Sequence, residues 1–216
     1  MVQQFPDCST LPLNIFARFI MGYQYDYTEA TNRFTPYFAW AKKTNILELQ
    51  PEDFPQIHLS KPFTIIGRTR EGHGVILLQL KNLKIKGMNH DDFSKYVGAI
   101  VNNTLRTADP SLDTYYMIID VKDYTKDNFD MEGLKKLTPI FSNYFPDVLF
   151  RMALINLGFF ASNMFSLVMM FMHEVTRKKI KIVKENVQLI KSTLLEDIDL
   201  DTIPVAYGGN NTIQLG

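Results

Sequence analysis

Short β-prone runs alternate with helical patterns through most of the chain after residue 60, and this alternation limits the folds available to it. The runs cover residues 63–68, 75–80, 115–121, 148–157 and 180–183. Residues 70–74 join the first two runs too closely for a crossover, so these runs form a hairpin. Helical spacing separates the later runs, and a strand, a helix and a strand in sequence give a parallel pair. The pattern predicts an α/β fold with a mostly parallel sheet.

The chain before these runs shows helical patterns only. Apolar residues between Leu13 and Ile20 fall on one face of a helix that follows Pro12. Asp26, followed three residues later by a glutamate, resembles a capping box and opens a second helix, which Pro36 must kink or split. Further helices are predicted over residues 93–105, 131–144, 161–172 and 187–195, the first of them opened by Asn89 or by an aspartate behind it.

The length of 216 residues allows one sizeable core rather than two independent domains. We predict a helical N-terminal lobe over residues 1–55 and an α/β domain over residues 56–216, which together form one compact, monomeric unit. Lys plus Arg and Asp plus Glu both number 23, so the net charge of zero gives no indication of a nucleic-acid partner. The single cysteine, Cys8, excludes an internal disulfide, and the first ten residues lack a secretory signal. We therefore expect a cytoplasmic protein.

Residues 152–172 form an uncharged, mostly apolar stretch about as long as the ~20 residues that span a bilayer. A single transmembrane helix is one interpretation of this stretch. However, Asn156, Gly158 and Ser162 form a polar break in its middle, which favours a strand, a turn and a helix instead.

Enzyme motifs are absent from the sequence. The four histidines are scattered, no HExxH or GxSxG motif occurs, and no glycine-rich phosphate loop follows a predicted strand. We assign no catalytic residue, no metal site and no cofactor.

Several segments follow one another in a characteristic order in the C-terminal third. They are Tyr144-Phe145-Pro146-Asp147, residues 149–156, residues 159–172, Arg177-Lys178-Lys179-Ile180, and Ile203-Pro204 followed by Gly208-Gly209. Upstream lie the helical residues 13–42, Gly72-His73-Gly74-Val75, and Ile118-Ile119-Asp120-Val121. This ordered set resembles the CRAL-TRIO family of lipid-binding and lipid-transfer domains. The resemblance implies a helical N-terminal lobe, then a mostly parallel β-sheet floor and a helical lid that enclose an apolar pocket, as in phosphatidylinositol and tocopherol carriers.

The lid and the floor supply the candidate pocket residues. Residues 159–172 are apolar around the whole helix, which suits a lid that faces ligand on one side, and the alternative is a fully buried core helix. Alternate residues of the strands face the pocket as its floor. The predicted floor comprises Tyr115, Met117, Ile119, Phe150, Met152 and Leu154, and the predicted lid comprises Phe159, Phe160, Met164, Phe165, Val168 and Phe171.

Asp147 and Lys179 occupy the positions where phosphatidylinositol carriers of the family place an acidic and a basic head-group contact. The carboxylate accepts hydrogen bonds from sugar hydroxyls, and the ammonium group binds phosphate. The family's adjacent basic pair in the N-terminal lobe corresponds here to Tyr23 and Gln24, and its Ser/Thr pair for choline lipids to Tyr115 and Met117. We therefore expect an apolar or weakly polar lipid first and a phosphoinositide second.

Arg177, Lys178 and Lys181 belong to the densest basic stretch of the chain. Such residues attract an anionic membrane surface by about 1 kcal/mol each, although a solvated face is an equally good interpretation. The sequence thus predicts a cytoplasmic protein, peripheral at membranes, that binds one hydrophobic ligand in an internal pocket and transfers or presents it between membranes. The alternative is a protein-interaction or regulatory module of the same fold.

Overall fold

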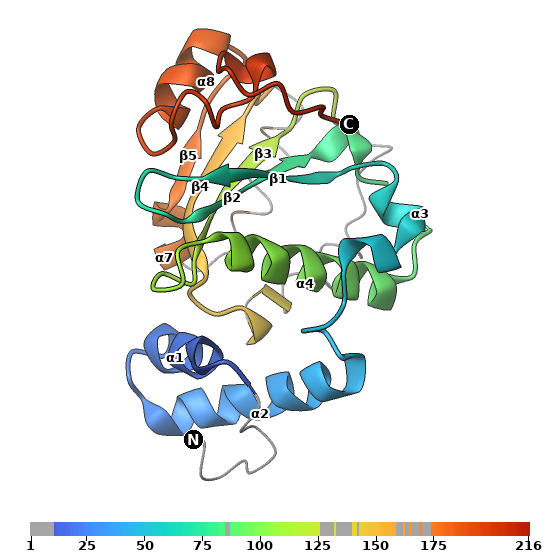
Figure 1. Cartoon of the computed structure of the whole chain (residues 1–216), viewed down its shortest axis with the longest axis vertical. Coiled ribbons are helices and arrows are strands. Elements are labelled where there is room, and N and C mark those ends of the chain that lie inside the picture. Colours follow the sequence, from blue (N-terminus) through green and yellow to red (C-terminus); the bar gives the residue numbers. More distant parts are fainter. Residues whose placement is uncertain are drawn as a thin grey trace.

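The computed structural model describes residues 11–84, 87–125, 132, 140–141, 143–158, 162, 165, 169 and 174–216. A central sheet contains the strands β1 (Phe63–Arg68), β2 (Gly74–Gln79), β3 (Tyr115–Asp120), β4 (Leu149–Ile155) and β5 (Ile180–Ile182), in this spatial order. Only β1 runs antiparallel, because it forms a hairpin with β2, and the other neighbours pair in parallel (Figure 1). The predicted α/β class with a mostly parallel sheet is confirmed.

The helices begin and end where local signals predict. They are α1 (Leu13–Gly22), α2 (Tyr27–Thr44), α3 (Pro55–His58), α4 (His90–Thr107), α7 (Glu174–Lys178) and α8 (Val187–Leu194). Asp26 caps α2 by accepting hydrogen bonds from the backbone N–H groups of Thr28 and Glu29. Asn89, rather than an aspartate behind it, caps α4. Pro36 lies inside α2, which continues through it as one helix.

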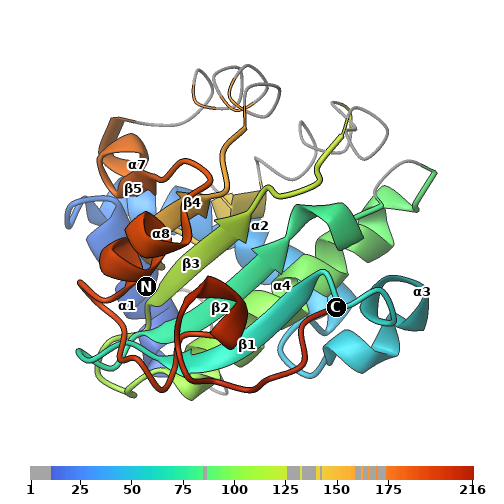
Figure 2. The same ribbon diagram turned by 90° about the horizontal axis from the view of Figure 1, so that it is seen from above.

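Helices cover the two faces of the sheet unequally. On one face α4 packs against β1 and β2, and on the other face α8 and the C-terminal segment pack against the sheet (Figures 1 and 2). On the α8 face, apolar side chains of the sheet and the helix pack into one buried core, which includes Ala153 and Ile155 of β4 and Ile190 and Leu194 of α8. Each face therefore has its own core, with the sheet between them.

Helices α1 and α2 form a small aromatic core of their own. The Phe34 ring lies 5.0 Å from that of Phe16 and 5.4 Å from that of Phe19. Trp40 of α2 joins this core to the rest of the chain by stacking on Tyr144, with ring centroids 4.5 Å apart. The limits of the two predicted domains stay a prediction.

The apolar stretch over residues 152–172 does not begin as a helix. Its first four residues, 152–155, belong to strand β4, so the interpretation of this stretch as one transmembrane helix is wrong. Among the helical residues that the structure describes, none form a helix long and apolar enough to span a bilayer. The helices predicted over residues 131–144 and 161–172 lie largely outside the described residues.

Candidate functional site

Alternate residues of β3 face the same side of the sheet as α4. Tyr115 and Met117 are buried in the core beneath α4, and Ile119 packs against its edge. Met152 belongs to the same core, and it pairs with Met117 across the two strands. These four residues share one face, as the alternation of the strands predicts.

Phe150 is the exception in the predicted floor. Tyr115 pairs with Leu149, but Tyr116 pairs with Arg151, so one extra residue of β4 bulges at this point. The bulge turns Phe150 to the opposite face, where it packs with the core beneath α8. The prediction that Phe150 shares a face with Met152 is therefore wrong, because strict alternation fails across the bulge.

A small apolar cluster lies where β3 and β4 end. Val121 and Leu154 are buried there, and half-buried Ile119 and Phe165 pack against them. Leu154 thus lies on the predicted floor, and the predicted lid residue Phe165 lies against that floor. The other predicted lid residues are outside the described part of the chain, namely Phe159, Phe160, Met164, Val168 and Phe171.

Asp147 and Lys179, the two head-group candidates, form an ion pair at the other end of β4. The Lys179 Nζ lies 3.2 Å from the Asp147 Oδ1 and donates a second hydrogen bond, of 2.6 Å, to the Leu149 carbonyl oxygen. Asp147 takes a left-handed backbone conformation, with φ of 56°, in the turn before β4. Both side chains remain partly exposed, so a polar ligand group can reach them.

The three membrane-surface candidates differ in their surroundings. Arg177 and Lys178 are exposed on α7, where Lys178 pairs with Glu174 of the same helix, and no described residue pairs with Arg177. Lys181 instead pairs with Glu196, in the loop after α8. Both side chains of this pair are partly exposed, and the membrane-surface role of all three residues stays a prediction.

Asp120 of β3 connects its strand to the end of β4 and to the C-terminal segment. It is not among the predicted site residues. Its carboxylate accepts hydrogen bonds of 2.7 Å from the Tyr207 hydroxyl, 2.7 Å from the Asn156 side-chain amide and 2.9 Å from the Lys122 backbone N–H. Burial, followed by the charge of Asp120, raises the pKa of Tyr207 above its usual range, which keeps the hydroxyl a proton donor. The sequence does contain a signal for this site, since Asp120 and Asn156 are each the second-last residue of a predicted strand.

His73, in the β1–β2 hairpin, stacks on Phe150 with ring centroids 3.7 Å apart. The guanidinium carbon of Arg151 lies 4.9 Å from the centroid of the same Phe150 ring, and Arg151 pairs with the buried Asp197. Burial lowers the pKa of the His73 imidazole, and the smaller effect of Glu71 opposes this change. The neutral imidazole is therefore the form that fits the fold.

The lowered pKa of His73 makes the stability of the fold depend on pH. Below about pH 6.5 the unfolded chain binds a proton at this residue more readily than the folded chain, so the free energy of unfolding falls as the pH drops. The slope from one group stays under about 1.4 kcal/mol per pH unit. The variant His73→Phe, which keeps a ring against Phe150, is expected to lose less stability than the wild type between about pH 7 and pH 5. Urea unfolding across this range measures the difference, and equal pH slopes would contradict it.

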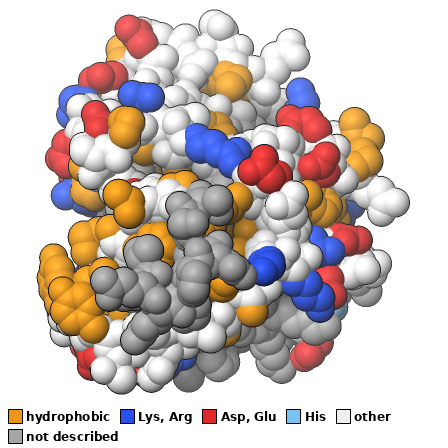
Figure 3. All heavy atoms as spheres, turned by 60° about the horizontal axis from the view of Figure 1, so that its bottom comes forward, with side chains coloured by type: hydrophobic (Ala, Val, Ile, Leu, Met, Phe, Trp, Pro, Cys, Tyr) orange, Lys and Arg blue, Asp and Glu red, His pale blue; other side chains and the backbone are white. Residues whose placement is uncertain are grey.

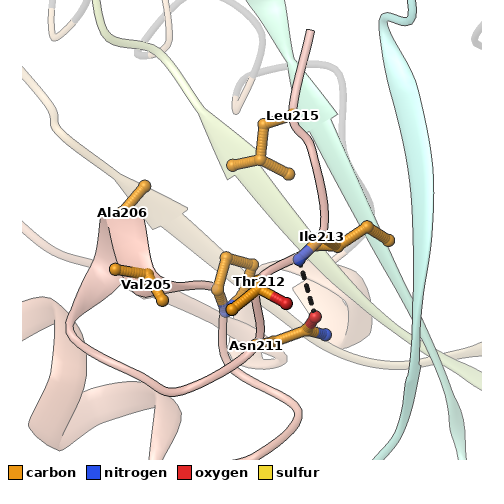
Figure 4. A pocket seen from close by; sticks show the side chains of 7 residues that line it. Val205, Ala206, Asn211, Thr212, Ile213 and Leu215 are labelled. Carbon is orange, nitrogen blue, oxygen red and sulfur yellow. Dashed lines mark hydrogen bonds between the residues drawn. The ribbon is translucent and has the colours of Figure 1, made fainter.

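A cavity of about 380 Å³ opens near the C-terminus, on the α8 side of the sheet (Figure 4). Its lining comprises Pro204, Val205, Ala206, Asn211, Thr212, Ile213 and Leu215. The backbone N–H of Ile213 donates a hydrogen bond to the Asn211 side chain, which fixes this turn. The cavity shares no residue with the predicted lipid pocket.

In the described part of the chain, no group of three His, Cys, Asp or Glu side chains is arranged to hold a metal ion.

Residues 59–209 match the model of the CRAL/TRIO domain. The Sec14 cytosolic factor of Schizosaccharomyces pombe is 25% identical over 191 residues, which are 88% of this chain and 62% of that protein. The CRAL-TRIO domain-containing protein YKL091C of Saccharomyces cerevisiae is 29% identical over 111 residues, which are 50% of this chain and 35% of that protein. The chain thus spans less than two thirds of the length of either curated relative.

The fold is also similar to that in a solved structure, the crystal structure of Sfh5. The TM-score is 0.72 at 18% sequence identity, and the match covers 93% of this chain and 72% of that one. At this identity the likeness concerns the fold alone.

Proposed function

Since the chain belongs to the CRAL/TRIO domain family, a family of lipid-binding and lipid-transfer proteins, we propose that it holds one apolar ligand against its sheet and transfers or presents it between membranes. The ligand lies on the face that carries α4, between the strands and Phe165. We further propose a cytoplasmic protein that meets membranes only peripherally.

The observation that carries this proposal is an apolar sheet face that extends beyond its covering helix. Helix α4 packs against β1 and β2, whereas the same face continues over β3, β4 and β5. On this continuation Met117 and Met152 are buried, whereas Ile119 of the central strand β3, Leu149 at the start of β4 and Ile180 of the edge strand β5 are half-buried. A hydrocarbon chain that covers the exposed parts of these half-buried side chains would contribute about 25 cal/mol for each Å² of apolar surface removed from water.

The polar end of the site favours an apolar or weakly polar lipid. Asp147 and Lys179 already neutralise one another, and Lys179 also binds a backbone carbonyl, so little charge remains to balance a phosphate. Tyr23 and Gln24 stand where a basic pair would add further cations. A phosphoinositide is the second candidate, because its head group can separate the ion pair and bind both partners.

Native mass spectrometry of the freshly purified chain tests the proposal. We expect a bound mass of one lipid or other apolar molecule per chain, and extraction then identifies it. Transfer of that molecule between donor and acceptor vesicles distinguishes a carrier from a protein-interaction module of the same fold. A chain that carries no ligand and transfers none would favour the interaction module.

A larger side chain on the floor of the proposed pocket is expected to reduce ligand loading without unfolding the chain. The variant Ile119→Trp places a larger ring at a half-buried position beside Leu154, where it competes with the ligand for space. We expect the affinity for the ligand to fall about tenfold, which corresponds to roughly 1.4 kcal/mol of lost binding and lowers the ligand-bound fraction. Leu189→Trp is the matched control, since Leu189 is exposed on α8 on the other side of the sheet. Equal loading of both variants would show that Ile119 does not line the pocket.

A further inference from the structure

Helix α1 has an outer face without charge. Leu13, Ala17 and Met21 follow one another at intervals of four residues, and all three are exposed, with Leu13 at 78% and Met21 at 45%. The only charged residue of the helix, Arg18, is buried and turns inward to bind Asp113. An exposed helix face normally carries charged side chains, so this apolar stripe is unusual for a surface in water.

Two exposed tyrosines extend the stripe across the turn to α2. Tyr25 is 65% and Tyr27 is 64% exposed. Gln24 and Tyr25 both take left-handed backbone conformations, with φ of 53° and 64°, which are uncommon for residues other than glycine. The Tyr25 backbone N–H donates a hydrogen bond of 2.9 Å to the Ile20 carbonyl oxygen, and the Asp26 cap follows directly. The turn is therefore fixed and holds its aromatic side chains outward.

We call Leu13, Ala17, Met21, Tyr25 and Tyr27 the α1–α2 patch. Hydrophobic side chains gather at the lower left of Figure 3, on the side of the molecule where α1 and its turn lie in Figure 1. The patch combines a thioether with two amphipathic rings, and tyrosine rings favour the boundary between water and hydrocarbon.

The patch ends beside the ion pair between Asp147 and Lys179, at the polar end of the proposed pocket. An added Cβ at Gly22, the last residue of α1, would lie 2.9 Å from the Pro146 Cβ and 3.5 Å from the Asp147 Cβ. Asp147 pairs with Lys179, which follows α7 directly, and α7 lies on the same side of the molecule as α1 in Figures 1 and 2. Helix α7 adds exposed Val175 and the cation Arg177. Apolar side chains and a positive charge thus border the polar end of the proposed pocket together.

We infer that the α1–α2 patch docks on the surface of an anionic bilayer, with Met21, Tyr25 and Tyr27 entering the interfacial region and Arg177 facing the lipid head groups. The inference extends the proposed function, because docking here brings the polar end of the pocket to the membrane. Charge complementarity favours a bilayer as the occupant, since Arg177 is exposed without a described partner, and the negative charge of Asp26 lies at the positive N-terminal end of α2. Asp26 caps α2, and Glu29 pairs with Arg33 at 2.7 Å.

Vesicle sedimentation of the full chain tests this inference. The triple variant Met21→Gln/Tyr25→Asn/Tyr27→Gln removes the apolar tips, and asparagine tolerates the left-handed conformation at residue 25. Leu59→Gln/Val205→Gln is the matched control, because these side chains are 80% and 59% exposed and lie outside the patch. With phosphatidylcholine vesicles that contain phosphatidylserine, we expect the triple variant to partition about tenfold less than the wild type, and the control within about twofold of it. Circular dichroism melting verifies that every variant is folded.

The outcomes separate the docking surface from the proposed function. Weaker binding of the triple variant, with wild-type ligand loading by native mass spectrometry, supports the docking surface. Equal binding of the triple variant and the wild type would overturn it, and so would a ligand-loaded wild type that binds no vesicles. If the triple variant loses a co-purifying protein but binds vesicles normally, the patch belongs to a protein partner and the bilayer inference is wrong. A wild type that docks through the patch but neither carries nor transfers a ligand supports the docking surface and rejects the proposed function.

Discussion

Replacing Asp120 with alanine is expected to lower the free energy of unfolding by about 3–5 kcal/mol. The buried carboxylate accepts hydrogen bonds from Tyr207, Asn156 and the Lys122 backbone, and hydrogen bonds to charged groups contribute about 1.5–3 kcal/mol each. Its removal leaves the Tyr207 hydroxyl buried without an acceptor and frees the C-terminal segment from β3. Urea unfolding followed by circular dichroism measures this loss.

A double-mutant cycle with Tyr207→Phe separates the hydrogen bond from the packing of the ring. The phenylalanine variant alone is expected to lose about 1–2 kcal/mol, since the ring stays in place and one hydrogen bond is removed. The combined variant should lose about 1–2 kcal/mol less than the sum of the single losses, because both changes remove the same bond. Additive losses, or a loss under about 1 kcal/mol for Asp120→Ala, would show that this network does not stabilise the fold.

The helices and strands could be predicted because their signals are local. Asp26 and Asn89 accept hydrogen bonds from N–H groups two or three residues ahead of them, so the helix starts are determined by short sequences. The β1–β2 hairpin is similarly local, with Gly72 in a left-handed conformation at φ of 98°. The parallel order of the remaining strands follows from the helices or long segments between them.

The errors arose where the structure depends on partners distant in sequence. Phe150 has the periodicity of a floor residue, and only its pairing with β3 places the bulge that turns it to the other face. The partner of Lys181 could not be predicted either, since Glu196 meets it only because α8 packs across the sheet. The role of Asp120 has the same origin, since Tyr207 lies 87 residues away in the chain. Periodicity assigns a residue to a face, whereas pairing and packing assign its neighbours.

The N-terminal lobe depends on another contact of this kind, between Arg18 of α1 and Asp113 before β3. Arg18 Nε lies 3.0 Å and Arg18 Nη2 2.8 Å from the Asp113 Oδ2, and Asn14 donates a further hydrogen bond of 2.8 Å to Oδ1. The two side chains are only 4% and 11% exposed. A charge buried this deeply is costly without its counterion, so the pair holds the patch-bearing helix α1 to the sheet domain.

The variant Asp113→Asn is expected to destabilise the chain by about 3–5 kcal/mol, because it leaves the buried guanidinium without a counterion. Asparagine has nearly the same shape and tolerates the left-handed φ of 48° at this position, so the loss reports the charge rather than backbone strain. Adding Arg18→Met removes the buried charge and keeps an apolar stem beside Phe145, which the guanidinium now overlies at 5.9 Å. We therefore expect the double variant to be more stable than Asp113→Asn alone by about 1–3 kcal/mol in urea unfolding. If the double variant is instead the less stable of the two, Arg18 stabilises the lobe through contacts other than this ion pair.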